Sequence, residues 1–217
     1  MQYFKSLKFY AYIILFLAPY SILYSGSMVG TVVDQNGNLL ENAVITIIGE
    51  NSTILDNETV MPPPIMNQKN IQFSPFVLPV AAGTTVYFPN KDDVRHHVYS
   101  FSKVKRFELE LYGGDEEKSV LFDKEGVVAL GCNIHDQMLA YIYIARSNKF
   151  ATTDKDGKIA IGNLDAGKYS AIVWHPRLKG KEDDFSQEIS ISQNGATNIT
   201  FEIPLKREKN RKKKSNY

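Results

Sequence analysis

The residues best suited to chemistry lie in one short stretch, residues 131–138, which reads Gly-Cys-Asn-Ile-His-Asp-Gln-Met. Cys132 is the only cysteine of the chain, and His135 and Met138 follow it at intervals of three residues. A thiolate, an imidazole and a thioether, joined by a second imidazole, form the soft ligand set that favours copper. The spacing Cys-x-x-His-x-x-Met therefore predicts a metal-binding loop that supplies three of four ligands.

The fourth ligand is expected from a histidine elsewhere in the chain. His96 and His97 are adjacent in a segment that has the composition of a β-strand. Neighbouring residues of a strand point to opposite faces of the sheet, so both can line one site only if the strand bulges. The residue pattern alone leaves both histidines open as ligands.

Other interpretations of the Cys-His-Met pattern are weaker. Zinc is the rival ion, but it prefers thiolate, imidazole or carboxylate to a thioether. A buried, inert cysteine is common in proteins, yet it leaves the histidine and methionine at fixed spacing unexplained. Asp136 adds a carboxylate beside His135 that is itself a possible ligand.

The start of the chain has the layout of a secretory signal peptide. Lys5 and Lys8 precede an apolar run over residues 9–24, and small residues follow at 25–27. An uncleaved membrane anchor is the alternative, but the run is shorter than the roughly 20 apolar residues that span a bilayer, and Pro19 interrupts it. We expect a signal peptide over residues 1–27, a periplasmic protein, and no membrane span after cleavage.

The expected export of the protein affects how its single cysteine is interpreted. In an oxidising compartment an unpaired thiol is prone to oxidation or to intermolecular disulfides. A bound metal would occupy the thiolate and remove this liability. The expected location of the protein therefore supports a metal at Cys132.

Charge and motifs narrow the function classes. The 217 residues carry a formal net charge of +1, so the chain as a whole has no nucleic-acid footprint. The strongly basic tail, residues 206–217, is expected to be a solvated terminus, with an electrostatic handle for an acidic partner or lipid surface as the alternative. No catalytic triad, paired catalytic carboxylates or phosphate loop is present in the sequence, so we expect no enzyme.

The pattern of apolar residues predicts an all-β protein. Residues 29–33 and 43–48 are β-rich runs around a turn-forming segment and suggest an opening hairpin. Residues 51–65 contain three consecutive prolines and are expected to be a linker. Short strands separated by turns fill the rest of the chain, and no segment after residue 27 has a sustained helical period.

The first and last blocks of strands resemble two parts of one domain. The pattern is Gly30-x-Val32-x-Asp34-x-x-Gly37 and Ala43-x-Ile45, continued by Thr153-Asp154-x-Asp156-Gly157 and Leu164-x-Ala166-Gly167-x-Tyr169. It resembles the carboxypeptidase regulatory-like, transthyretin-like β-sandwich. The resemblance implies a sandwich made of residues 28–50 and 148–205, with the intervening residues inserted into one of its loops. Two tandem domains are the plainer alternative.

The block between these segments, residues 66–147, resembles the cupredoxins of the amicyanin and plastocyanin type. The resemblance rests on His96-His97-Val98 and on the Cys-x-x-His-x-x-Met spacing. It implies a Greek-key β-sandwich with one type 1 copper bound by His96, Cys132, His135 and Met138. It also implies one-electron transfer with a redox partner such as a c-type cytochrome or a dehydrogenase, which docks at the edge of His135.

A longer run, residues 88–102, together with the ligand loop is similar to plastocyanin-like proteins associated with methylamine utilisation. The chain departs from the amicyanin pattern at Gly131, where an aromatic residue is usual, and at Asp136, which replaces a proline. His97 stands where that family has an asparagine, and we interpret it as a group that bridges the two ligand segments. The alternative function is a non-redox one: copper handling, or binding of carbohydrate or protein by an envelope β-sandwich.

Overall fold

The computed structural model describes residues 25–49, 62–193 and 195–207 of the chain, and nearly all of its regular structure is β-strand. The helix in this part of the chain is a single 3₁₀ turn, η1 (Glu182–Phe185). The prediction of an all-β fold is confirmed. No helix in the described ranges is long and apolar enough to cross a membrane.

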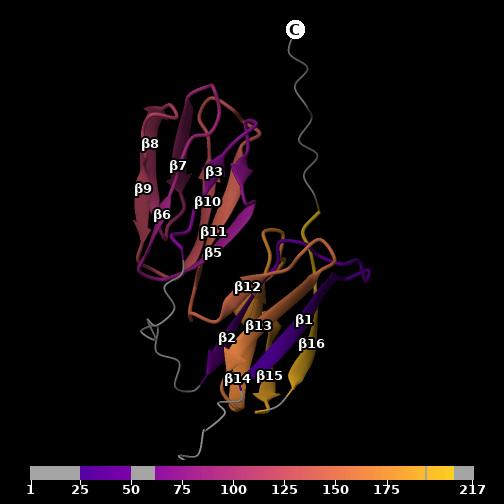
Figure 1. Cartoon of the computed structure of the whole chain (residues 1–217). Helices are drawn as coiled ribbons and strands as arrows, with labels where there is room; N and C mark the ends of the chain where they lie inside the picture. Colours follow the sequence, from indigo (N-terminus) through magenta and orange to yellow (C-terminus); the bar gives the residue numbers. More distant parts are fainter. Residues whose placement is uncertain (1–24, 50–61, 194, 208–217) are drawn as a thin grey trace, which may run out of the picture.

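The strands form two bodies, which Figure 1 shows joined near β12. The lower body in that view contains two sheets, in the orders β13-β1-β16 and β12-β2-β14-β15. Their bounds are β1 (Gly26–Asp34), β13 (Lys158–Leu164), β16 (Ala196–Ile203), β12 (Phe150–Thr152), β2 (Val44–Gly49), β14 (Gly167–Trp174) and β15 (Ser186–Ile191). Strand β1 alternates buried and half-buried residues along its whole length, as a strand with one face on a core must. Buried residues of both sheets, among them Val32, Ile45 and Phe201, make one core.

The predicted opening hairpin is wrong, because β1 and β2 lie in different sheets. β1 pairs with β13 and, in parallel, with β16, while β2 pairs with β12 and β14. The turn between them does form: the Asp34 carboxylate accepts hydrogen bonds from the backbone N–H groups of Asn36 and Asn38. The chain then crosses to the second sheet. The apolar faces of β1 and β2 therefore pack against each other across the core, and the two strands are not neighbours in one sheet.

The upper body has a five-stranded sheet, in the order β5-β11-β10-β7-β8, and two short two-stranded sheets. The five strands are β5 (Val77–Ala81), β11 (Leu139–Ala145), β10 (Gly126–Gly131), β7 (His96–Phe101) and β8 (Arg106–Tyr112). The short sheets pair β3 (Asn67–Gln68) with β4 (Phe73–Ser74) and β6 (Thr84–Tyr87) with β9 (Ser119–Phe122). A second core, which includes Phe88, Phe122 and Ile142, fills the space between these sheets.

Aromatic packing joins the two bodies. Tyr143 of β11 stacks on Trp174 of β14, with ring centroids 5.2 Å apart, and the two residues lie in or against a small third cluster with Val44 and Ala145. Arg146, just beyond β11, pairs with Glu182 of η1 at 2.7 Å. The end of β11 is therefore fixed to the lower body by both apolar and ionic contacts.

Several predicted segments lie partly outside the described residues. Of the predicted signal peptide, 1–27, only residues 25–27 are described, and Gly26 and Ser27 already belong to β1. Of the predicted linker, 51–65, residues 62–65 are described, and Ile65 makes a β-bridge with Tyr87. Only residues 206 and 207 of the basic tail are described. The boundaries of the predicted domains stay a prediction.

Candidate metal centre

The four predicted ligands come from one strand and one loop. His96 is the first residue of β7, and the other three lie between β10 and β11. The register of β10 and β11 pairs Gly131 with Leu139, so the sheet closes on both sides of the seven-residue loop 132–138. Gly131 also pairs with Tyr99 of the antiparallel strand β7, which places the start of β7 beside the loop.

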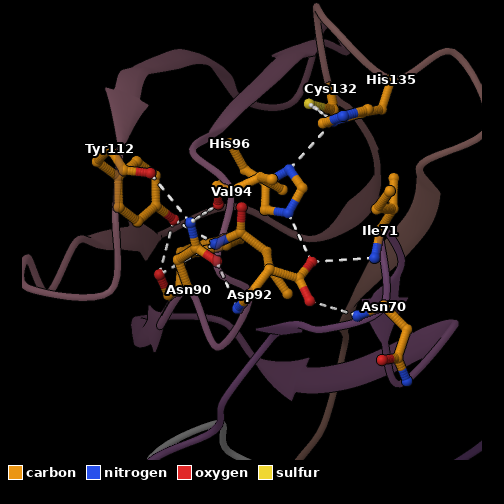
Figure 2. A network of polar contacts seen from close by, with 11 residues as sticks. Asn70, Ile71, Asn90, Asp92, Val94, His96, Tyr112, Cys132 and His135 are labelled. Carbon is orange, nitrogen blue, oxygen red and sulfur yellow. Dashed lines mark hydrogen bonds and ion pairs between the residues drawn. The ribbon is translucent and has the colours of Figure 1, made fainter.

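Three of the four side chains converge (Figure 2). One ligand atom each of His96, Cys132 and His135 lies within 4.8 Å of the others. The two Nδ1 atoms of the histidines are 3.2 Å apart, and Cys132 Sγ is 3.7 Å from His135 Nδ1. His96 and Cys132 are buried, whereas His135 is half-buried. The group is thus a cluster of donors in which His135 is the member nearest the surface.

These separations fit a single metal ion. Bonds of the length that zinc makes, about 2.0–2.1 Å to nitrogen and about 2.3 Å to sulfur, separate two nitrogens by about 3.3 Å and a nitrogen from a sulfur by about 3.6 Å when arranged tetrahedrally, so the spacing suits a metal ion and the donor types distinguish copper. The Nδ1–Nδ1 and Sγ–Nδ1 distances are close to both values. Two imidazoles and one thiol are also the donors that a copper site of the His₂Cys type requires. The residues therefore fit the metal that the sequence predicts.

Met138 ends the same loop. Its side chain is 2% exposed and belongs to the same buried cluster as Cys132. Its backbone N–H donates to the carbonyl oxygen of His135 at 2.9 Å, a bond that closes the last turn of the loop before β11. Met138 is therefore held in the same buried core as Cys132.

His97 does not have the bridging position that the sequence suggested. Its Nε2 lies 2.7 Å from Glu108 Oε1 on β8, and its ring lies 5.8 Å from that of Tyr99. The register of β7 and β8 shifts between His96 and Val98. Even with this irregularity, the side chains of His96 and His97 contact different residues. The structure therefore brings His96, and not His97, to Cys132 and His135, and the proposed bridge by His97 is wrong.

The residue that supports His96 is Asp92, four residues earlier in the chain. Asp92 Oδ2 is 2.7 Å from His96 Nε2, and it also accepts the backbone N–H of Ile71 at 2.9 Å. Asp92 Oδ1 accepts the N–H of Asn70. Burial raises the pKa of the carboxyl, but the hydrogen bonds from Ile71, His96 and Asn70 outweigh it and leave the pKa below its ordinary value.

Asn90 fixes the segment that carries Asp92. Its side-chain N–H groups donate to the carbonyl oxygens of Val94 and Tyr112, and its Oδ1 accepts the N–H of Asp92 at 2.9 Å. Tyr112 is fully buried, and its hydroxyl donates to the Phe88 carbonyl at 2.7 Å. Burial raises the pKa of Tyr112 to about 12, so this hydroxyl stays protonated as a donor at neutral pH. An asparagine two residues before an aspartate is a turn signal from which this support could have been suspected.

The two departures from the amicyanin pattern have different surroundings. At Gly131, a Cβ atom would lie 2.7 Å from the Tyr99 ring, so the space beside the strand is filled by an aromatic residue from β7. Asp136 is exposed, as is its neighbour Ile134, which is 53% accessible. Asp136 is not one of the three grouped ligands.

His175 lies in the lower body, far from this group in the sequence, and has a structural environment. Its Nδ1 accepts the backbone N–H of Arg177 at 3.1 Å. Burial, followed by the charge of Arg177, lowers its pKa to about 4. His175 is therefore a neutral, hydrogen-bonded imidazole in the lower body.

The chain is similar in structure to several copper proteins, at low identity. A purple cupredoxin from Nitrosopumilus maritimus is 23% identical over 37% of this chain and 96% of its own, with a TM-score of 0.34. The amicyanin of Paracoccus versutus is 17% identical over 46% and 97%, with a TM-score of 0.36. A Cu-containing nitrite reductase from Thermus scotoductus is 22% identical over 53% of this chain and 28% of the reductase, with a TM-score of 0.38.

No family model matches the chain, and no curated protein matches it. The function is therefore argued below from the site's own residues.

Proposed function

We propose that the protein binds one copper ion through His96, Cys132, His135 and Met138 and transfers single electrons outside the cytoplasm. The observation that carries the proposal is the convergence of two imidazole nitrogens and a thiol at separations that one ion would span. Two imidazoles and one thiol gathered in this way are the donor set that a His₂Cys copper site uses.

The chain's own residues give the site its properties. When bound, copper supplies a couple that gains and loses one electron. His96, Cys132 and Met138 are buried, so three of the four proposed ligands are shielded from water. Because the donors already lie close to binding distances, little rearrangement is needed between the two charge states. A preorganised site of this kind favours fast electron exchange.

His135 is the proposed contact for a redox partner. It is the half-buried member of the group, and exposed Ile134 precedes it in the loop. A partner such as a c-type cytochrome or a dehydrogenase would dock over this edge. The periplasm is the proposed location, in keeping with the leader-like sequence of residues 1–27.

The test is an absorption spectrum after addition of Cu(II) to the purified, folded protein. A Cu–thiolate site of this type gives an intense visible charge-transfer band. We expect the band in the wild-type protein and in Met66→Leu, which alters another buried methionine of the same core. We expect it to disappear in Cys132→Ser.

Two results would defeat the electron-carrier proposal: a folded, copper-loaded protein without the band, or a band that survives in Cys132→Ser. Tight Cu(I) binding with no stable Cu(II) form would instead support the copper-handling alternative. His96→Gly should lose the band and recover it with added imidazole, while His97→Gly should keep it.

A further inference from the structure

The carboxylate of Asp92 is held from one side by an unusual turn. The hairpin between β3 and β4 turns at Asn70 and Ile71, whose φ values are +56° and +57°. The turn is closed by reciprocal backbone hydrogen bonds between Lys69 and Gln72. A β-branched residue such as isoleucine rarely adopts this left-handed conformation. Here the conformation points two successive backbone N–H groups at the two oxygens of Asp92.

The opposite side of Asp92 is held by Asn90. Asn90 Oδ1 accepts the Asp92 N–H, and Asn90 itself is fixed by carbonyl groups of Val94 and Tyr112. Figure 2 shows this chain of contacts running from Tyr112 through Asn90 and Asp92 to His96. The left-handed turn on one side and the hydrogen bonds of Asn90 on the other therefore fix the position of the same carboxylate.

The contact between Asp92 and His96 decides which ring nitrogen carries the proton. An ionised carboxylate only accepts hydrogen bonds, so the contact at 2.7 Å requires a hydrogen on His96 Nε2. A neutral imidazole then has its lone pair on Nδ1, the atom that lies 3.2 Å from His135 Nδ1. In the metal-free protein the hydrogen between the two rings therefore belongs to His135.

We propose that Asp92 is a positioning residue that holds His96 as the Nε2–H tautomer, with Nδ1 turned into the site, and that the Asn70–Ile71 turn holds Asp92 for this purpose. The tautomer is a property of the metal-free chain. Its consequence for copper rests on the proposed function: His96 presents a ready lone pair, whereas His135 must first move its hydrogen from Nδ1 to Nε2.

Two-dimensional NMR of histidine ring nitrogens in the metal-free, ¹⁵N-labelled protein tests the tautomer. The control is Asp93→Asn, which removes the same charge from an exposed neighbouring residue. The wild-type protein and Asp93→Asn should show His96 as the Nε2–H form, and Asp92→Ala should show a mixture of tautomers or the Nδ1–H form. The proposal is overturned if Asp92→Ala keeps the wild-type tautomer. If that variant does not fold, the wild-type spectrum decides: an Nδ1–H form of His96 would overturn the proposal.

Competition with a Cu(I) chelator tests the consequence. Loss of a hydrogen-bonding partner behind a metal-binding histidine typically lowers metal affinity about 10- to 100-fold. We expect such a loss in Asp92→Ala and a change of less than about threefold in Asp93→Asn. Equal losses in both variants would show a general charge effect and overturn the positioning role. If the wild-type protein binds no copper, the proposed function fails while the NMR result on His96 still stands.

Discussion

Replacing Tyr143 by phenylalanine should weaken the junction between the two bodies. The Tyr143 hydroxyl is buried and donates to Glu182 Oε2 at 3.1 Å, while Thr46 Oγ1 lies 3.5 Å from it. Burial, followed by the negative charge of Glu182, raises the pKa of Tyr143, so the hydroxyl is a permanent donor at neutral pH. The substitution removes this one oxygen and keeps the ring that stacks on Trp174.

The expected loss of stability follows from the charge of the hydrogen-bond partner, Glu182. A hydrogen bond to a charged group contributes about 1.5–3 kcal/mol to stability. Glu182 keeps its contact with Arg146 at 2.7 Å after the substitution, so the lower part of this range applies. We expect a loss of about 1.5–2 kcal/mol in the free energy of unfolding, or about 3–8 °C in Tm for a protein of this size.

Urea unfolding monitored by tryptophan fluorescence measures this loss. The signal reports on the junction between the two bodies, because Trp174 is the only tryptophan of the chain. Tyr169→Phe is the matched control, since its hydroxyl donates to the Asp165 carbonyl at an exposed position and should contribute only about 0.5 kcal/mol. Equal losses in the two variants, or a loss below about 0.5 kcal/mol in Tyr143→Phe, would refute the reasoning.

Three further results are expected. Unfolded His175 binds a proton below its ordinary pKa of 6.5, while the folded form stays neutral to about pH 4, so stability should fall by about 3 kcal/mol as the pH drops through this window, and His175→Gln should reduce that fall in acid unfolding curves. Gly131→Ala should displace the Tyr99 ring and cost about 1–3 kcal/mol in denaturant unfolding. Met138→Leu should shift the copper reduction potential measured by voltammetry, whereas Met66→Leu should leave it unchanged.

The fold class could be predicted from the sequence because alternation is a local signal. Strand β1 shows it most clearly, with every second residue buried. The path of the chain between strands could not be predicted this way. A tight turn forms at Asp34, as a hairpin would require. Nevertheless β2 belongs to another sheet, and its apolar residues pack against those of β1 across the core.

The candidate site, like the fold, could be predicted only in part from the sequence. Cys132, His135 and Met138 are close in sequence, so their spacing alone predicts a shared loop. The support behind His96 depends on backbone N–H groups of Asn70 and Ile71, about twenty residues away from Asp92 in the chain. Backbone donors leave no signature in residue types, which explains why this contact was missed.

The candidate site lies beyond one end of β11, while the lower body contacts β11 further along the strand. The ligand loop meets β11 at Leu139, while the contacts to the lower body run from Tyr141 through Tyr143 to Ala145 at the other end. Six strand steps of about 3.3 Å separate these ends by about 20 Å. We therefore expect that the junction can be altered without displacing the ligand loop. Tyr143→Phe should accordingly lower stability while the copper absorption band keeps its position and intensity.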